Sequence, residues 1–91
     1  TYTEIIESPL LYQNCYVLWK GKAANVTESP EQITCNFLIG YHEEKMLEGT
    51  IPVRFNFAIR ISPEEPIELL GKLIINESGM ISLEGIAIHR L

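Results

Sequence analysis

The stretch Val53-Arg54-Phe55-Asn56-Phe57-Ala58-Ile59-Arg60-Ile61 has the most regular pattern in the chain, because a large apolar side chain stands at every odd position. The even positions hold arginine, asparagine, alanine and arginine. Successive side chains of a β-strand point to opposite faces of the sheet. This period of two therefore predicts a strand over residues 53–61, with one face in a core and the other in water.

Two stretches that precede this one are predicted to be strands on the same grounds. Residues 32–42 repeat the alternation, and residues 14–28 carry it over a longer distance. In the longer stretch we expect the apolar phase to change near Gly21, so that Ala24 and Val26 take over the core positions. A glycine at a phase change is typical of a bulge or a sharp bend in a long strand.

The C-terminal part of the chain predicts two further strands, over residues 67–75 and 80–91. The segment 62–66 contains two prolines and ends the strand before it, because proline interrupts ladder pairing. Residues 76–79 have the composition of a hairpin turn. Within the last strand we expect Gly85 to break the apolar phase once more.

Five strands, two of them long and bent at glycines, would expose an edge if they formed an open sheet. Closure into a barrel removes that edge, and bulges supply the curvature that closure needs. We therefore predict one all-β domain over residues 1–91, a five-stranded antiparallel barrel, with an SH3-like barrel and a small β-sandwich as alternatives. Residues 1–11 are expected to form an N-terminal extension or short helix. Because the chain starts with Thr1, we expect either a domain excised from a longer protein or a mature chain whose leader has been removed.

The order of the predicted strands resembles an OB-fold. Residues 67–75 resemble the fourth strand of many OB-folds, in which a glycine, here Gly71, follows a short apolar run. Residues 79–83 resemble the start of their last hairpin. The resemblance implies a small barrel that binds ligands on its second and third strands. One departure is the short segment 62–66, which leaves no room for the helix usual between the third and fourth strands.

A second resemblance concerns the early strand alone. Residues 16–22 are similar to a segment of Slp-type bacterial envelope lipoproteins, which carry a Trp-Gly pair there. In this chain Lys20 separates Trp19 from Gly21. The compartment stays open, with an extracytoplasmic or bacterial-envelope location as one possibility. No apolar run reaches the roughly 20 residues of a membrane helix, so we expect no membrane insertion in this segment.

No motif in the sequence points to catalysis, a cofactor or a metal. The adjacent pairs Glu43-Glu44 and Glu64-Glu65 are predicted to lie in loops, where neighbouring carboxylates point apart and stay ionised. The cysteines and histidines lack the close spacing of zinc ligands. Cys15 and Cys35 both fall on the apolar face of predicted strands, so we expect two buried, inert thiols. The sequence therefore predicts a protein that is not an enzyme.

The charge balance bears on the ligand that such a domain would bind. There are 12 acidic residues against 7 basic ones, and the net charge of −5 disfavours sequence-independent binding to nucleic acid. The polar positions of the strand 53–61 nevertheless form a possible ligand face, with Arg54, Asn56, Arg60 and, flanking them, Lys72. The phenylalanines share the phase of the core, which leaves few aromatic rings for base stacking.

An apolar patch is the other candidate site. Leu70 and Ile74 are out of phase with the core face of their strand, and with Leu18 or Leu38 they would form a surface for a partner. The alternative is that this strand is buried on both faces. The sequence favours a non-enzymatic binding or protein-interaction domain, with a protein partner or self-association preferred over nucleic acid. The alternative function is binding of single-stranded nucleic acid or oligosaccharide through the face of the second and third strands.

Overall fold

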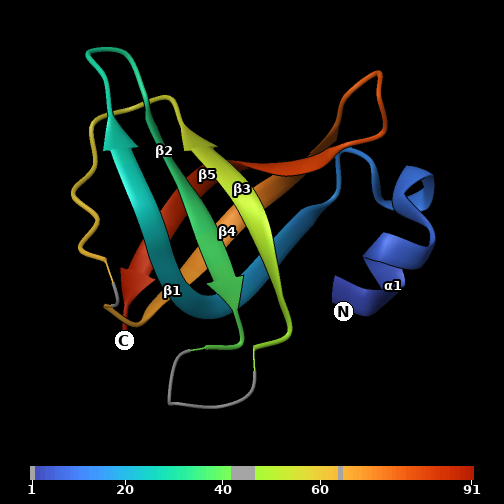
Figure 1. Ribbon diagram of the computed structural model, residues 1–91, viewed down its shortest axis with the longest axis horizontal. Coiled ribbons are helices and arrows are strands. Elements are labelled where there is room, and N and C mark those ends of the chain that lie inside the picture. The colour runs from blue at the N-terminus through green and yellow to red at the C-terminus, as the bar shows by residue number, and fades with distance from the viewer. Residues whose placement is uncertain (1, 42–46, 64) are drawn as a thin grey trace.

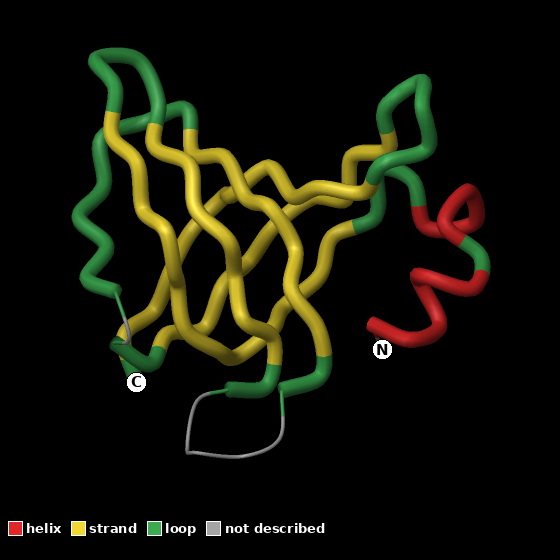
Figure 2. The backbone as a smooth tube through the Cα atoms, viewed as in Figure 1, coloured by secondary structure: helices red, strands yellow, loops and turns green. Residues whose placement is uncertain are grey.

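Five β-strands close into a barrel in the order β1-β2-β3-β5-β4, so that the last strand along the chain lies between the third and the fourth (Figures 1 and 2). The computed structural model describes residues 2–41, 47–63 and 65–91. The strands are β1 (Tyr16–Glu28), β2 (Ile33–Ile39), β3 (Gly49–Phe55), β4 (Ile67–Ile75) and β5 (Ile81–Arg90). The predicted five-stranded, all-β barrel is therefore confirmed.

The barrel closes through a short parallel contact between β3 and β5. All other neighbouring strands are antiparallel. The closing contact consists of two residue pairs, Val53 with Leu83 and Arg54 with Glu84. The hairpin pattern predicted antiparallel pairing between all neighbouring strands. The parallel pair departs from this prediction, since it joins two strands that are distant in the sequence and are not connected by a hairpin.

β1 belongs to both halves of the barrel because it bends at Gly21. This residue pairs with Ile67 of β4 and also with Ile39 of β2. A Cβ atom at this position would overlap the backbone carbonyl oxygen of Leu38 in β2. The bend that joins the two halves therefore requires a residue without a side chain.

The apolar phase of β1 changes at Asn25, and the prediction that it changes at Gly21 is wrong. Gly21 and Ala23 are both buried, so Ala23 takes the core position that was expected for Ala24. Asn25 has a left-handed backbone with φ of 54°, a conformation in which asparagine is enriched. The register with β2 shifts just after Ala24. This bulge inserts a residue and brings Val26 against the core.

β3 ends at Phe55, although the alternation predicted a strand over residues 53–61. Phe55 pairs with Ile33, the first residue of β2, so the chain beyond Phe55 has no partner on that side. The apolar residues that follow still cover the core. The ring of Phe57 packs edge-on against that of Phe55, with 5.8 Å between the centroids, and Ile61 is buried.

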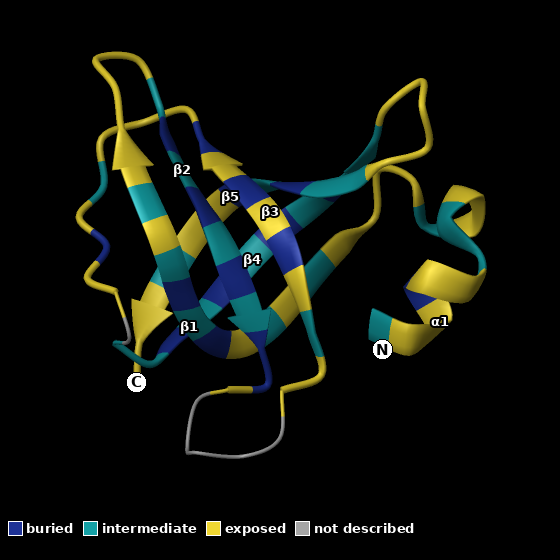
Figure 3. Ribbon diagram, in the orientation of Figure 1, coloured by how far each residue is buried: buried dark blue, intermediate teal, exposed yellow. Residues whose placement is uncertain are grey.

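The interior of the barrel is filled by the inward residues of all five strands (Figure 3). None of the polar or charged side chains in the described part of the chain is buried. Full burial of each large apolar side chain contributes about 2 kcal/mol to the hydrophobic term. The largest of the fully buried side chains are Phe37, Phe55, Ile39, Ile51, Leu69, Leu73 and Leu83.

The N-terminal residues and the β3–β4 connection lie on opposite sides of the barrel (Figure 1). Helix α1 (Tyr2–Glu7) is followed by a single 3-10 turn at Pro9–Tyr12. Ile5 of α1 is buried in the core, and the ring of Tyr2 packs edge-on against Trp19 with 6.0 Å between centroids. Among its described residues, 56–63, 65 and 66, the β3–β4 connection contains no helix.

The bend at Gly21 can be tested by substitution. Gly21→Ala should lower the free energy of unfolding by about 2 kcal/mol, because the methyl group forces apart the backbones of β1 and β2. Gly71→Ala in β4 is the matched control, since its Cβ would meet a leucine methyl, Leu83 Cδ1, at 3.3 Å. Urea unfolding followed by circular dichroism measures both. Equal losses for the two variants would contradict the account of the bend.

Candidate ligand-binding face on β2, β3 and β5

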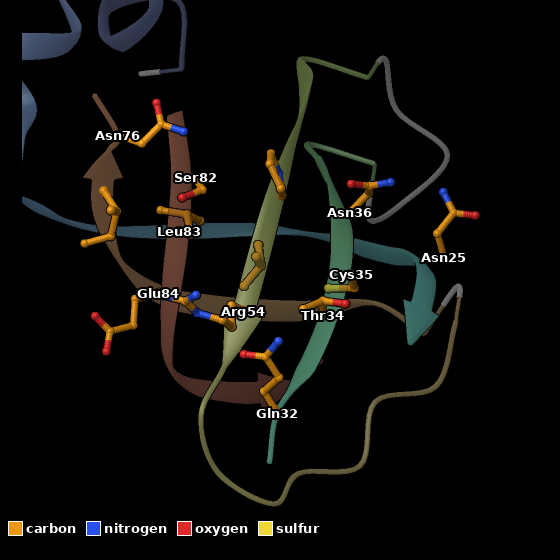
Figure 4. Close-up of a pocket in the computed structure, with 13 residues that line it drawn as sticks. Asn25, Gln32, Thr34, Cys35, Asn36, Arg54, Asn76, Ser82, Leu83 and Glu84 are labelled. Atoms are coloured by element: carbon orange, nitrogen blue, oxygen red, sulfur yellow. The ribbon is translucent and has the colours of Figure 1, made fainter. Parts of the chain in front are cut away.

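A hollow of about 610 Å³ lies on the outside of the barrel, over β2, β3 and β5 (Figure 4). Thr34 and Asn36 of β2 lie opposite Arg54 and Pro52 of β3. Their side chains point outward because the residues between them, such as Cys35, fill the core. The alternation that builds the core thus also places a row of polar groups on this face.

Two hairpin loops contribute to the rim of the hollow, and hydrogen bonds within each loop hold its shape. In the β4–β5 loop, Asn76 Oδ1 accepts hydrogen bonds from the backbone N–H groups of Ser78 at 3.0 Å and Met80 at 2.9 Å. In the β1–β2 loop, Ser29 Oγ accepts a hydrogen bond from the backbone N–H of Gln32 at 3.2 Å. Both loops therefore present side chains to the hollow from a defined backbone.

Seven polar side chains around the hollow have no partner within the described part of the chain. Each of them lines the hollow, and none forms a hydrogen bond or an ion pair with another described residue. Their polar groups are therefore available to a ligand. None of the residues that line the hollow is aromatic. The seven are Asn25, Gln32, Thr34, Asn36, Arg54, Ser82 and Glu84.

The charges around the hollow balance one another. Arg54 of β3 lies opposite Glu84 across the parallel contact, without a salt bridge among the described residues. Glu84 also lies opposite Lys72 of β4. Lys72 does not line the hollow, which therefore holds one positive and one negative side chain.

The structure separates the four residues predicted as a ligand face. Arg54 lines the hollow described above. Asn56 follows the end of β3 and lines a second hollow of about 420 Å³ beside the β1–β2 loop. Arg60 lies in the β3–β4 connection, where its backbone carbonyl accepts a hydrogen bond from the guanidinium group of Arg90. Lys72 lies two strands away from Arg54, on β4.

The two residues predicted as a partner patch also have different surroundings. Leu70 is half-buried and lies opposite Leu18, whose exposure is 60%. Ile74 is half-buried, lies opposite Ser82 and lines the hollow. The outward side chain of Lys72 stands between Leu70 and Ile74 on the same strand.

The two cysteines differ in exposure. Cys35 is buried beneath the hollow, and its burial raises the pKa of the thiol from 9.0 to about 11. Cys15 is exposed, so the prediction of two buried thiols is wrong for this residue. It precedes the first residue of β1, and its backbone carbonyl accepts a hydrogen bond from the N–H of Leu73 in β4 at 2.8 Å.

Other candidate groups show no clustering in the described part of the chain. Among residues 2–41, 47–63 and 65–91, no group of three or more histidines, cysteines or carboxylates could hold a metal ion. Glu43, Glu44 and Glu64 of the two glutamate pairs lie outside the described residues, as does His42.

No helix in the described chain has the length and apolar composition that crossing a membrane requires.

A five-stranded barrel whose bent first strand pairs with both the second and the fourth, and which closes through parallel β3 and β5, is an OB-fold. Residues 1–89 match the family described as Spirochaete C-terminal OB fold, and the chain belongs to this family. No curated protein matches the chain in sequence.

A solved structure of a Replication Protein A heterotrimer bound to single-stranded DNA contains a similar fold. One chain of that structure matches this one with a TM-score of 0.65 and 14% sequence identity. The match covers 84% of this chain and 57% of the other. The likeness confirms the OB-fold that the strand order suggested.

Sequence reasoning missed most of the residues that line the hollow. Thr34 and Asn36 stand at the even, outward positions of a strand that was predicted correctly, so their exposure could have been inferred. The sequence could not show that Ser82 and Glu84 lie on the same face as these two residues, because that placement depends on the parallel contact of β5 with β3. Asn25 lines the hollow because it lies at the bulge of β1, which was predicted near Gly21.

The raised pKa of Cys35 predicts a loss of stability at alkaline pH. In the unfolded chain the thiol ionises near pH 9.0, whereas in the folded domain it stays neutral up to about pH 11. Stability is therefore complete below pH 9.0 and falls as the pH rises toward 11, by an amount on the order of 2 kcal/mol. Chemical denaturation across this interval should show a steeper fall for the native domain than for Cys35→Ala. Parallel curves for the two proteins would contradict the burial of this thiol.

Proposed function

We propose that this domain is a non-enzymatic binding module that holds an extended polar ligand across the outer face of β2, β3 and β5. The observation that carries the proposal is the set of seven polar side chains around one hollow without partners in the described chain. A ligand with matching groups would replace its hydrogen bonds to water with hydrogen bonds to the protein. The protein would need little reorganisation to form them, since regular strands hold most of these side chains.

The position of the hollow supports the same proposal. OB-folds bind oligonucleotides and oligosaccharides on the face of strands 2 and 3 and with the β1–β2 and β4–β5 loops. Gln32 and Asn76 of these two loops lie at the rim of the hollow. One chain of the Replication Protein A heterotrimer is similar in fold over part of its length, and that heterotrimer is bound to single-stranded DNA. Single-stranded nucleic acid and oligosaccharide are therefore the two ligand classes to compare at this face.

The chemistry of the hollow favours binding over catalysis. Of the residues that line it, only Arg54, Glu84 and Cys35 have side chains that titrate. A general acid–base pair needs two groups whose environments separate their pKa values, and Glu84 is the only carboxylate in the lining. A thiol with a raised pKa stays protonated and is a weak nucleophile at neutral pH.

A protein partner is a second candidate, favoured by an exposed apolar site on another part of the barrel. Leu18 of β1 is 60% exposed and lies beside the half-buried Leu70 of β4. Tyr16, on the same outward side of β1, is 63% exposed. Exposed apolar side chains that adjoin one another are typical of contact sites for proteins.

Binding at the hollow is tested by titrating the ¹⁵N-labelled domain with mixed-sequence single-stranded DNA and with a panel of oligosaccharides. Saturable shifts should cluster at Thr34, Asn36 and Ser82. The double variant Thr34→Ala/Asn36→Ala should weaken binding about tenfold, because two hydrogen bonds are lost. Thr50→Ala is the control, since Thr50 is outward on β3 but does not line the hollow.

Shifts that cluster at Leu18 and Leu70 would contradict this proposal and favour the protein-partner candidate. A double variant that binds as tightly as the native domain would contradict it as well, because the ligand would then lie elsewhere.

A further inference from the structure

We infer that the ligand of this face is a neutral oligosaccharide and not a nucleic acid. The inference rests on the proposed function, because it assigns a chemical class to the ligand of the same hollow. Three properties of the lining point to it: the balance of hydrogen-bond donors and acceptors, the balance of charge, and the nature of the apolar groups.

The uncharged polar groups of the hollow match hydroxyl groups better than phosphates. The side chains of Asn25, Gln32 and Asn36 each offer an acceptor oxygen and a donor NH₂ group, and Thr34 and Ser82 offer hydroxyls. A sugar hydroxyl both donates and accepts, so it can use every one of these groups. A phosphodiester only accepts, so it offers no donor to the three amide oxygens.

The charged groups of the hollow disfavour a polyanion. Single-stranded nucleic acids are bound in positively charged grooves that follow the phosphates. Here Arg54, which carries the only positive charge of the lining, pairs in register with Glu84, which carries the only negative one, without a salt bridge among the described residues. A phosphate that approached Arg54 would also approach Glu84, whereas a neutral sugar could accept from the first and donate to the second.

The apolar groups of the hollow are aliphatic. Pro52 is exposed at the wall of the hollow on β3, and Ile74 is half-buried on β4. Base stacking in single-strand binding proteins requires aromatic side chains, and none lines this hollow. Pro52 and Ile74 can make van der Waals contact with the C–H groups of a sugar ring, which does not require a flat aromatic surface. The volume of about 610 Å³ is typical of a site for a short ligand segment, within roughly 300–1,000 Å³.

The test compares neutral hexasaccharides with a nucleic acid on the same labelled domain. The probes are maltohexaose, cellohexaose, mannohexaose and chitohexaose, each titrated to millimolar concentration, and the twelve-nucleotide oligomer of thymidine at low salt. At least one hexasaccharide should shift the amides of Thr34, Asn36 and Ser82 saturably, and the oligonucleotide should leave them unmoved.

A charge reversal sharpens the comparison. Glu84→Lys should weaken hexasaccharide binding about tenfold and should introduce salt-sensitive binding of the oligonucleotide, because the hollow then holds two cations. Glu68→Lys is the matched control. It makes the same charge change on β4, opposite Lys20 and His89, at a position that does not line the hollow. This control should leave hexasaccharide binding unchanged.

The ligand class and the binding face can be tested independently. If the native domain binds the oligonucleotide at the hollow and none of the hexasaccharides, the inference about the ligand class is wrong and the binding face stands. If none of the probes perturbs the hollow, the inference and the proposed function are both overturned. Unchanged hexasaccharide binding by Glu84→Lys would also contradict the role assigned to this carboxylate.

Discussion

The close contact of β1 with the backbone of β2 at Gly21 is the constraint on which the rest of the structure depends. Only there does one residue pair with both β2 and β4, and a Cβ atom would collide with the carbonyl oxygen of Leu38. The bend directs the second half of β1 toward β2 and the first half toward β4. Because β3 pairs with β2, the same bend also positions β3 and therefore the outer face on which the hollow lies. Barrel closure and the candidate site thus share one cause.

The face on β2, β3 and β5 shows how a simple alternation serves two purposes. Inward positions such as Cys35 and Val53 fill the core, and the outward positions between them carry amides, hydroxyls and one guanidinium group. The net charge of the whole chain, −5, says little about this face, where Arg54 and Glu84 balance each other. Local pairing between strands therefore decides which ligand chemistry the site can accept.

The sequence was a good guide to the strands and a poor one to the site. The pattern of residues 67–75 predicted β4 with its correct bounds, because alternation and flanking turns agreed there. The predicted strand 53–61 was too long, since alternation cannot show that β2 begins at Ile33 and leaves the later residues without a partner. Arg54, Asn56 and Arg60 were therefore placed on one strand, whereas in the structure only Arg54 lies within β3 and lines the hollow. The contact between Arg54 and its neighbour on β5 depends on parallel pairing between distant segments, which no local pattern encodes.

Contact of the ligand with the outer face of β2, β3 and β5 is the feature on which the proposed function depends. Intermolecular NOEs test it most directly, recorded with isotope filtering on the doubly labelled domain saturated with an unlabelled neutral hexasaccharide. The account predicts NOEs from sugar protons to the side-chain amide of Asn36, the methyl group of Thr34 and the Cβ protons of Ser82. NOEs confined to the methyl groups of Leu18 and Leu70 would contradict it and would move the binding site to the β1–β4 side of the barrel.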